Sequence, residues 1–386
     1  MMRPTNDVKN KPKPTWMRRI GTVLIFIVWL IVVIEVSTRI LFSFNRPPHW
    51  ILGTDDTSWR LAWVRLHQTG RSLTGQYSVY HAERGWAVRP DIKDMSVFGG
   101  KILNSNSKGL RGKTSYEYQR TPGKGRIVVL GDSFTFGEEV SDEETYPHDL
   151  ESALSNTEVL NLGVSGYGHD QMLLDLKEEG VKYHPDVVLL GFVFPDVYRN
   201  ILSFYSYAKP RFKLAPDGLS LTNVPVPTPD RVLAEESYRL KSLDLLLILK
   251  EKLRGRFGLI ETEARDMTRS LLDEIVATTR GVGGIPVLVY LPVGDEISDS
   301  QEAKTGGEQY LDSYCQDRGV ACLFLRPKLL DDIKNGARFR YQPDGHWGPE
   351  EHMAAAEAIK NFLREKSLVQ SGLTSSSVPS KRDVRN

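Results

Sequence analysis

From Arg126 onward, short apolar runs alternate with longer amphipathic stretches. The apolar runs are rich in β-branched residues, which is typical of buried strands in a parallel sheet. They cover residues 127–130, 158–161, 185–192, 285–291 and 320–325. Helical periodicity is found at residues 143–155, 169–180, 262–280, 306–318 and 349–366. Strands and helices that alternate in this way predict an α/β layer sandwich around a parallel sheet.

A different pattern opens the chain. Residues 1–19 carry six basic side chains and one acid, and the apolar stretch 20–44 then follows with charges only at Glu35 and Arg39. These two lie four residues apart, so on a helix they share a face and can pair. Roughly 20 apolar residues are enough to cross a bilayer, and the basic residues in front place the N-terminus inside. We therefore expect a cytoplasmic tail, a single transmembrane helix in the cell inner membrane, and the body of the chain outside.

A cleavable signal peptide is the alternative interpretation of this N-terminal stretch. Signal peptidases cut after a pattern of small residues. The segment 42–48 after the apolar run reads Phe-Ser-Phe-Asn-Arg-Pro-Pro and has no such pattern. The sequence therefore favours an uncleaved anchor.

The remaining segments depart from the strand–helix alternation. Residues 45–125 combine aromatic and turn residues with few periodic runs, so we expect an irregular extension packed on a main domain over 126–366. Residues 367–386 are rich in serine and basic side chains, which is typical of a disordered tail.

An insertion at residues 201–257 interrupts the main domain. The Pro-Asp-Gly sequence at 216–218 predicts a hairpin, and a leucine-rich helix is predicted over 234–254. This helix either packs on the domain, covers the site as a lid, or lies on the membrane.

Composition excludes some classes of function. The net charge of +1 over 386 residues gives no sign of the basic excess that nucleic-acid-binding domains show. The only cysteines, Cys315 and Cys322, are too few for a zinc site. They could pair in an oxidising compartment or remain as thiols.

Candidate chemistry follows the first two strands. Ser133 comes directly after the strand 127–130, at the edge where parallel sheets place their ligand sites. It is a candidate nucleophile, or alternatively a cap of the next helix. The glycine-containing run 161–166 follows the second strand. Its backbone N–H groups could approach a developing oxyanion, or it could be an ordinary turn.

Asp344 and His346 stand just before the last predicted helix. A serine nucleophile needs a base, and the base needs a carboxylate that fixes its tautomer; these two residues could supply both from one loop. They could equally be polar surface residues or metal ligands, with His148 and His352 as further candidate ligands. His169 could also line the site.

The order of these motifs resembles the SGNH (GDSL-type) hydrolase family. Gly131-Asp-Ser follows the first strand, Asn-x-Gly-x-x-Gly at 161–166 follows the second, and Asp-x-His at 344–346 lies near the C-terminus. The membrane-anchored bacterial subgroup also has an N-terminal helix that ends in Glu-x-x-x-Arg, here Glu35 and Arg39.

This resemblance covers 126–366 and implies a fold and a set of roles. The fold is a flavodoxin-like three-layer α/β/α sandwich with a parallel sheet, preceded by one transmembrane helix. The chemistry is ester or acyl transfer without a cofactor or metal. Ser133 would be the nucleophile, His346 the base and Asp344 its orienting carboxylate, and the backbone N–H groups of Ser133 and Gly166 would form the oxyanion hole.

The third motif of the family is replaced in this chain. Where the family has an asparagine that donates to the oxyanion, Pro195 stands after the strand 185–192. Loss of one such donor costs on the order of a hundredfold to a thousandfold in turnover. Three readings follow: the site works with two donors, Asn200 or another group substitutes, or the site binds without turnover.

The sequence thus predicts an extracytoplasmic serine esterase or acyltransferase. Its substrate would carry O-acyl ester groups, as on envelope or secreted polysaccharide, and nucleic acid is not expected as a partner. The alternative is a non-catalytic, membrane-anchored scaffold that holds acylated glycan. A phosphatase or nucleotide-binding module is disfavoured, because no glycine-rich phosphate loop with its lysine is present.

Overall fold

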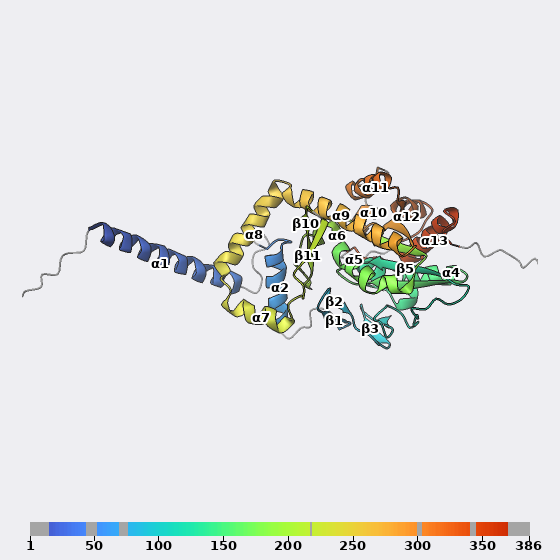
Figure 1. Cartoon of the computed structure of the whole chain (residues 1–386), viewed down its shortest axis with the longest axis horizontal. Coiled ribbons are helices and arrows are strands. Elements are labelled where there is room, and N and C mark those ends of the chain that lie inside the picture. The colour runs from blue at the N-terminus through green and yellow to red at the C-terminus, as the bar shows by residue number, and fades with distance from the viewer. Residues whose placement is uncertain are drawn as a thin grey trace, which may run out of the picture.

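The computed structural model describes residues 15–43, 52–68, 76–216, 218–298, 303–339 and 345–369. Most of the predicted cytoplasmic tail, the predicted C-terminal tail from residue 370 onward, and Asp344 lie outside the described residues. A long helix, α1 (Thr15–Ser43), projects from one end of an α/β body (Figure 1).

Five parallel strands form the central sheet. They are β5 (Gly125–Gly131), β6 (Thr157–Gly163), β7 (Val187–Phe192), β12 (Ile285–Tyr290) and β13 (Ala321–Phe324). Their order across the sheet is β13-β12-β7-β5-β6, and every neighbouring pair is parallel. Counted along the chain this is the 2-1-3-4-5 order of flavodoxin-like folds. The predicted fold class is therefore confirmed, with each predicted strand within a few residues of its place.

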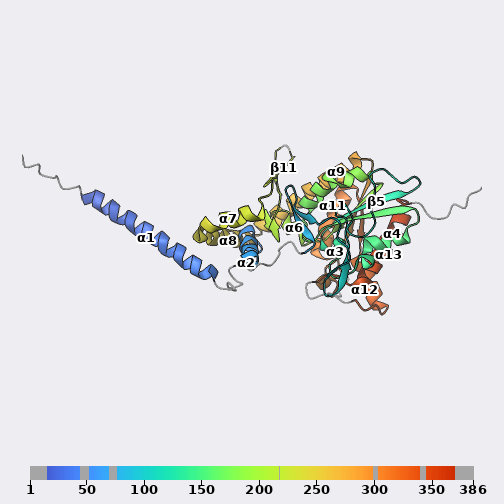
Figure 2. The same ribbon diagram turned by 90° about the horizontal axis from the view of Figure 1, so that it is seen from below.

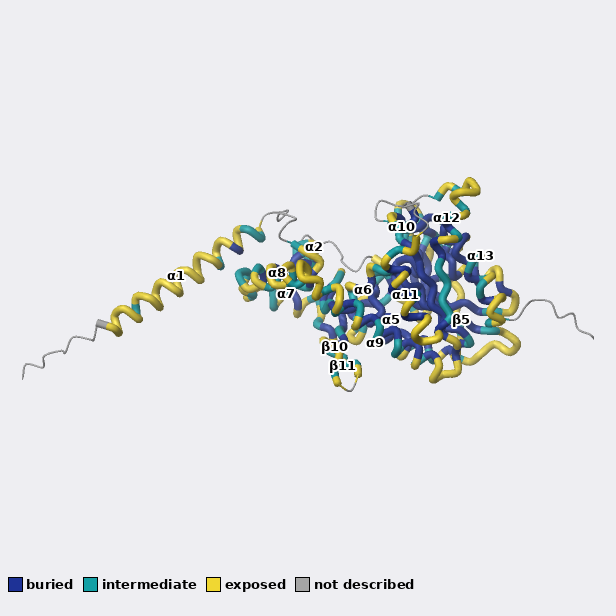
Figure 3. The backbone as a smooth tube through the Cα atoms, turned by 90° about the horizontal axis from the view of Figure 1, so that it is seen from above, coloured by how far each residue is buried: buried dark blue, intermediate teal, exposed yellow. Residues whose placement is uncertain are grey.

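Helices cover both faces of this sheet. One side carries α4 (Tyr146–Ala153), α12 (Arg326–Lys334) and α13 (Pro349–Glu365), and the other carries α5 (His169–Glu178), α9 (Leu259–Gly281) and α11 (Gly306–Arg318). Alternate residues of a strand point to opposite faces. Accordingly Ile127 and Val129 of β5 pack with the first set, and Val128 and Leu130 with the second. Figure 3 shows the strands as the most buried part of the molecule.

The shorter elements lie around the sheet. Helices α3 (Ser133–Phe136), α6 (Asp196–Arg199) and α10 (Gly294–Ser298) are each about one turn long. Before the sheet come α2 (Asp56–Gln68) and the hairpins β1 (Ser78–His81)–β2 (Gly85–Val88) and β3 (Met95–Val97)–β4 (Lys101–Leu103). The sequence did not predict α2.

The insertion contains two hairpins and two helices. The hairpin predicted around residues 216–218 is present as β10 (Arg211–Ala215) and β11 (Gly218–Thr222). A smaller one, β8 (Phe204–Tyr205)–β9 (Tyr207–Ala208), precedes it.

The prediction of a single helix at 234–254 is wrong. The segment forms α7 (Pro229–Tyr238) and α8 (Lys241–Arg256), because Arg239 and Leu240 are extended. The Glu35 carboxylate of α1 accepts hydrogen bonds from the backbone N–H groups of Lys241 and Ser242, which stabilises a new helix N-terminus there.

Helix α1 (Thr15–Ser43) corresponds to the predicted anchor. Among the described residues it is the one helix long and apolar enough to cross a membrane, over Trp16–Ser43. Glu35 and Arg39 form the expected ion pair at 2.7 Å. Figure 2 shows α7 and α8 beside the C-terminal end of this helix, with the sheet farther away.

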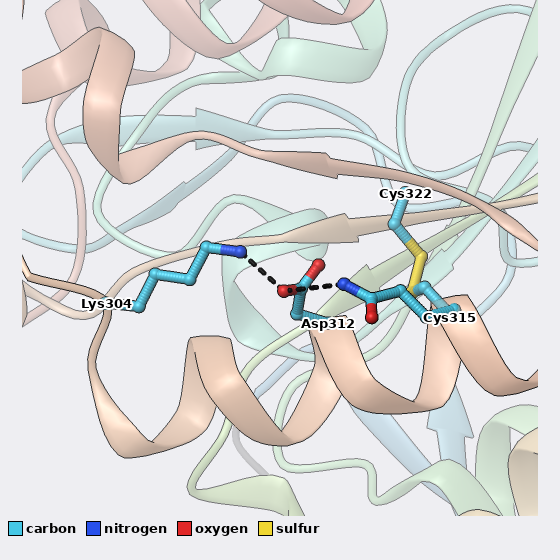
Figure 4. Close-up of a disulfide and its surroundings, with 5 residues drawn as sticks. Lys304, Asp312, Cys315 and Cys322 are labelled. Atoms are coloured by element: carbon cyan, nitrogen blue, oxygen red, sulfur yellow. Dashed lines mark hydrogen bonds and ion pairs between the residues drawn. A yellow bond between two sulfur atoms is a disulfide. The ribbon is translucent and has the colours of Figure 1, made fainter.

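Cys315 and Cys322 form a disulfide, so the pairing alternative left open by the sequence is the one found. The bond joins the end of α11 to the edge strand β13 with the Cα atoms 6.3 Å apart (Figure 4). One turn earlier on α11, Asp312 pairs with Lys304 at 2.5 Å.

Candidate active site

Ser133 lies at the carboxyl end of β5, where the strand turns into α3. Asp132 caps this helix, because its Oδ1 accepts a hydrogen bond from the backbone N–H of Phe134 at 3.0 Å. The capping role considered for Ser133 therefore belongs to its neighbour. A Cβ on Gly163 would lie 2.4 Å from the backbone nitrogen of Phe136, so only glycine in β6 lets α3 pack this closely.

His346 reaches Ser133 from the loop before α13. Its Nε2 lies 2.7 Å from the Ser133 Oγ, which is hydrogen-bond reach for a base and its nucleophile. The neighbouring Trp347 donates its indole N–H to the carbonyl of Pro292 at 2.9 Å. Its ring also packs edge-on against Phe134, with the centroids 5.4 Å apart. These contacts fix the histidine loop beside the serine helix.

Glu138 is a site residue that the sequence reasoning missed. Its Oε2 lies 3.4 Å from the Nε2 of His346. Its Oε1 accepts hydrogen bonds from the hydroxyls of Ser165 and, at 3.1 Å, Tyr77. Burial, together with this carboxylate, raises the pKa of Tyr77, so the phenol remains a donor. Glu138 faces Nε2 of His346, the nitrogen that also contacts Ser133. The orienting carboxylate predicted at Asp344 would instead contact the other ring nitrogen, so Glu138 does not take that role. Asp344 itself lies outside the described residues.

Gly137 is the sequence signal that could have found Glu138. It ends α3 after one turn in the left-handed conformation, with φ 87°. The backbone N–H of Glu138 then bonds back to the carbonyl of Ser133 at 3.0 Å. A glycine followed by an acid, four and five residues after a candidate nucleophile, favours a short helix that returns the acid to the serine.

Ser133, Glu138 and His346 open into a cavity of about 450 Å³. Aromatic side chains form part of its wall, among them Tyr77, Trp86 and Tyr205. Sites for small organic ligands commonly have about 300–1,000 Å³ and largely apolar walls with a few polar groups. The cavity therefore has the size and the lining of a ligand site.

Gly166 is the residue for which the sequence predicts a role in an oxyanion hole. It lines the same cavity with φ 78°, in the left-handed region that favours glycine. The indole N–H of Trp86 donates to the carbonyl of Ser165 at 2.9 Å and so fixes this loop. Within the described part of the chain, no backbone carbonyl accepts from the N–H of Ser133 or Gly166. Backbone N–H groups without such an acceptor are the kind of donors that can stabilise a developing oxyanion.

Asn200 is not brought to the site. Its side-chain amide donates to Thr268 at 2.7 Å and contacts the Nδ1 of His169 at 3.0 Å, and its side chain is fully buried. Among the described residues that line the cavity, Pro195 is present and Asn200 is absent. Asn200 therefore does not replace the missing asparagine donor, which corrects the expectation from the sequence. The side chain of Asn200 points toward α9, where Thr268 lies.

A charged side chain, that of Arg199, lies in the same segment as Pro195. Arg199 follows Pro195 by one helical turn and lines the cavity with 14% of its side chain exposed. Its guanidinium pairs with Asp132 at 3.3 Å and with Asp196 at 2.6 Å. Burial raises the pKa of the Asp196 carboxyl well above its ordinary value, and Arg199 opposes this shift. The arginine supplies positive charge beside the serine loop.

The three other candidate histidines, His148, His169 and His352, are not among the described residues that line the cavity. His169 and His352 are buried, and burial lowers the pKa of each to about 3. The Nδ1 of His352 accepts from the backbone N–H of Tyr146 at 3.2 Å. His148 is 44% exposed and lies beside Asp149. Over the described ranges, no three His, Cys, Asp or Glu side chains come together in a way that could hold a metal ion.

Comparison with known proteins gives similarity at the level of the fold. No protein-family model matches the sequence, and no curated protein matches it. A lipolytic protein of the G-D-S-L family from Desulfitobacterium hafniense matches with 15% identity and a TM-score of 0.39, over 62% of this chain and 100% of the other. A GDSL-like lipase from Bacteroides thetaiotaomicron matches with 13% identity and a TM-score of 0.37, over 64% of this chain and 92% of the other.

A two-domain esterase active on acetylated mannans is a third similar structure. It shares 12% identity and a TM-score of 0.38, over 67% of this chain and 54% of the other. The chain is therefore similar in structure to GDSL-family hydrolases. Similarity this low assigns no activity, and the chemistry has to be inferred from the site itself.

Proposed function

We propose that the protein is a membrane-anchored serine esterase or acyltransferase that acts on O-acyl esters outside the cytoplasm. The observation that carries this proposal is the 2.7 Å contact between Ser133 Oγ and His346 Nε2 at the mouth of a cavity. Ser133 is the nucleophile and His346 the base. Asp344, two residues before the histidine, is proposed from the sequence as the carboxylate that orients the imidazole.

The reaction proceeds in two halves. Ser133 Oγ attacks the ester carbonyl while His346 Nε2 takes the hydroxyl proton. The tetrahedral intermediate then collapses, the bond to the alcohol oxygen breaks, and His346 returns the proton to the leaving alcohol. The resulting acyl-serine is attacked by water or by a sugar hydroxyl, with His346 again as base, which releases a free acid or a new ester and restores Ser133.

Two features of the site favour this intermediate. The backbone N–H groups of Ser133 and Gly166 are the proposed donors to the developing oxyanion, since both residues line the cavity. The Glu138 carboxylate, 3.4 Å from His346 Nε2, favours the imidazolium that forms as the serine loses its proton. Donors and charges that are already in position cost no rearrangement during the reaction.

The substrate class is proposed from the cavity and the anchor. The cavity, with a volume of about 450 Å³ and partly aromatic walls, has room for an acyl group and one sugar unit. With the N-terminus inside, α1 would hold this cavity on the outer side of the inner membrane. Acylated envelope or secreted polysaccharide is available there.

The full-length protein in detergent tests the proposal. It should hydrolyse an activated acetyl ester and should be labelled by a fluorophosphonate at Ser133. The Ser133→Ala variant should lose both. Ser206→Ala is the matched control, because Ser206 lines the same cavity and has no assigned role. Absence of labelling in the wild type, or labelling that survives in Ser133→Ala, contradicts the assignment.

A non-catalytic scaffold that holds acylated glycan is the second candidate. Pro195 in the cavity wall favours it, since it removes the side-chain donor of the related enzymes. In this case a Ser133→Ala strain would keep the cellular phenotype, whereas deletion of α1 would abolish it. Serine-dependent hydrolysis by the purified protein decides for the enzyme.

A further inference from the structure

Helices α2, α7 and α8 form a helical layer at the C-terminal end of α1, and charged side chains lie in its interior. Asp244 of α8 is fully buried and pairs with Arg60 of α2 at 2.7 Å. Arg239 and Lys241 contact the same carboxylate at 3.0 and 3.3 Å, and Glu236 of α7 pairs with Arg60. These ion pairs lie beside buried apolar side chains, among them Trp63 of α2 and Val232 of α7. On the buried face of α8, charge pairing through Asp244 is therefore a main contact with α2 and α7.

Most apolar side chains of α8 itself lie on its outer face. Leu243, Leu246, Leu249 and Leu253 are spaced by three or four residues and so share one face, which Phe257, directly after the helix, extends. Their exposed fractions are 46%, 62%, 52% and 57%, and that of Phe257 is 69%. Asp244 and Ile248, on the opposite face, are fully buried. One exposed leucine would need no explanation, whereas a continuous face of this kind marks a surface that something covers.

The connection to α1 indicates what covers it. Glu35 accepts from the backbone N–H groups of Lys241 and Ser242 at 3.0 and 2.9 Å, and from the Ser242 hydroxyl at 2.7 Å. Arg39 donates to the carbonyl of Arg239 at 3.1 Å. The N-terminus of α8 is therefore fixed to α1 at the level of Glu35.

That level lies near the outer edge of a bilayer that α1 crosses. At about 1.5 Å per residue, the helix from Ile20, the first residue after the basic tail, to Glu35 covers about 23 Å of the roughly 30 Å of a hydrocarbon core, so Glu35 lies within about two turns of its outer edge. Figure 1 shows that α8 runs across the end of α1 and does not continue along its axis. A helix that starts at this depth and runs crosswise lies along the membrane surface.

We propose that α8 is an interfacial helix whose leucine face enters the boundary between headgroups and acyl chains, in the leaflet at the C-terminal end of α1. Lys250 and Arg256 are both exposed. Lys250 follows Leu246 by four residues and so lies within this face, whereas Arg256 lies at its border. The long side chains of both can extend to anionic headgroups. The inference rests on that part of the proposed function in which α1 crosses the membrane.

A lid over the active site is disfavoured for α8. Among the described residues that line the cavity of Ser133, the insertion contributes Tyr205 and Ser206 from the β8–β9 hairpin and none from α8. The insertion thus has two roles: its first hairpin shapes the cavity, and its second helix holds the body at a fixed height and tilt above the lipid.

Spin labels on the full-length protein test this placement. Single cysteines replace Leu246 on α8, Val28 in α1 and Met353 on α13, and each carries a nitroxide. The two native cysteines are joined in the disulfide and do not compete for the label. Met353 is the matched control, because it is 62% exposed, as is Leu246, and its helix α13 lies at the end of the body away from α1 (Figure 1). The protein is reconstituted in vesicles of phosphatidylcholine and phosphatidylglycerol.

Collisions with oxygen, which dissolves in lipid, are then compared with those of a water-soluble nickel chelate. We expect the Val28 and Leu246 labels to collide severalfold more with oxygen than with nickel, and the Met353 label to show the reverse. Nickel access at Leu246 with oxygen access at Val28 overturns the inference while leaving the anchor intact. Nickel access at both contradicts the anchor itself. A Leu246 label shielded from both reagents shows a protein partner or a second copy on this face, which also overturns the inference.

Discussion

Helices α8 and α9 follow each other in the chain and place their leucines in opposite surroundings. In α9, Leu271 and Leu272 are fully buried against the sheet. In α8, Leu246 and Leu249 are more than half exposed while Asp244 is buried. The comparison teaches that an apolar pattern shows which side chains avoid water, but whether protein or lipid receives them depends on the neighbours.

The largest expected effect on stability follows from removing the buried charge of Asp244 in the helical layer of α2, α7 and α8. Asp244→Ala leaves Arg60, Arg239 and Lys241 without their shared carboxylate, which should cost about 3–5 kcal/mol of unfolding free energy. Chemical denaturation of the full-length protein in detergent measures this loss. The exposed pair of Arg231 with Glu235 provides the control, since Glu235→Ala should cost less than about 1 kcal/mol. Equal losses for the two variants would mean that α8 is not held by charge.

A leucine pair tests the comparison directly. Leu271→Ala in α9 removes packed methyl groups from the core and should cost about 2–5 kcal/mol. Leu246→Ala in α8 removes the same atoms from an exposed position and should change the unfolding free energy by no more than about 0.5 kcal/mol. The same denaturation experiment applies, and a similar cost at both positions would show that protein covers the leucine face of α8.

On the catalytic side, Glu138→Gln should lower kcat about tenfold to a hundredfold. The substitution keeps the shape of the side chain but removes the charge that favours the imidazolium of His346. Steady-state hydrolysis of the activated ester measures it, with Glu143→Gln as the control because that carboxylate is exposed. An unchanged kcat would restrict Glu138 to holding Ser165 and Tyr77 in place.

The smallest effect concerns stability at acid pH. Burial lowers the pKa of His352 to about 3, whereas an unfolded histidine titrates near its ordinary value of 6.5. Between these values only the unfolded chain takes up the proton, so this contribution to stability is complete above pH 6.5 and is lost as pH falls toward 3.

Replacement of His352 by glutamine should remove this pH dependence. The loss in unfolding free energy between pH 6 and pH 5 should shrink by about 1 kcal/mol. His148 offers the control: a hydrogen bond with Asp149 raises its pKa, so this histidine favours the folded state in acid, and His148→Gln should leave the loss as steep or slightly steeper. A His352→Gln protein as sensitive to acid as the wild type would contradict the role of burial.

The sequence by itself determined the five strands, most of the helices on the sheet, the apolar N-terminal helix, and the three motifs that bear Ser133, Gly166 and His346. These features depend on residues within a few positions of one another, so periodicity and glycine placement are enough to reveal them. Motifs at the carboxyl ends of parallel strands meet at one edge, so Ser133 and Gly166 could be expected to lie close together. The pairing of Ser133 with His346 was expected only from the resemblance to SGNH hydrolases.

Only the tertiary structure decided which side chains complete the site and where the insertion lies. Glu138 comes to His346, Arg199 lines the cavity, and Asn200 turns away, because each depends on how loops from distant segments pack. The break between α7 and α8 depends on Glu35, some 200 positions away in the sequence. The leucines of α8 resemble core residues in the sequence, but its contacts with α1 and α2 bury the opposite face and leave them outside.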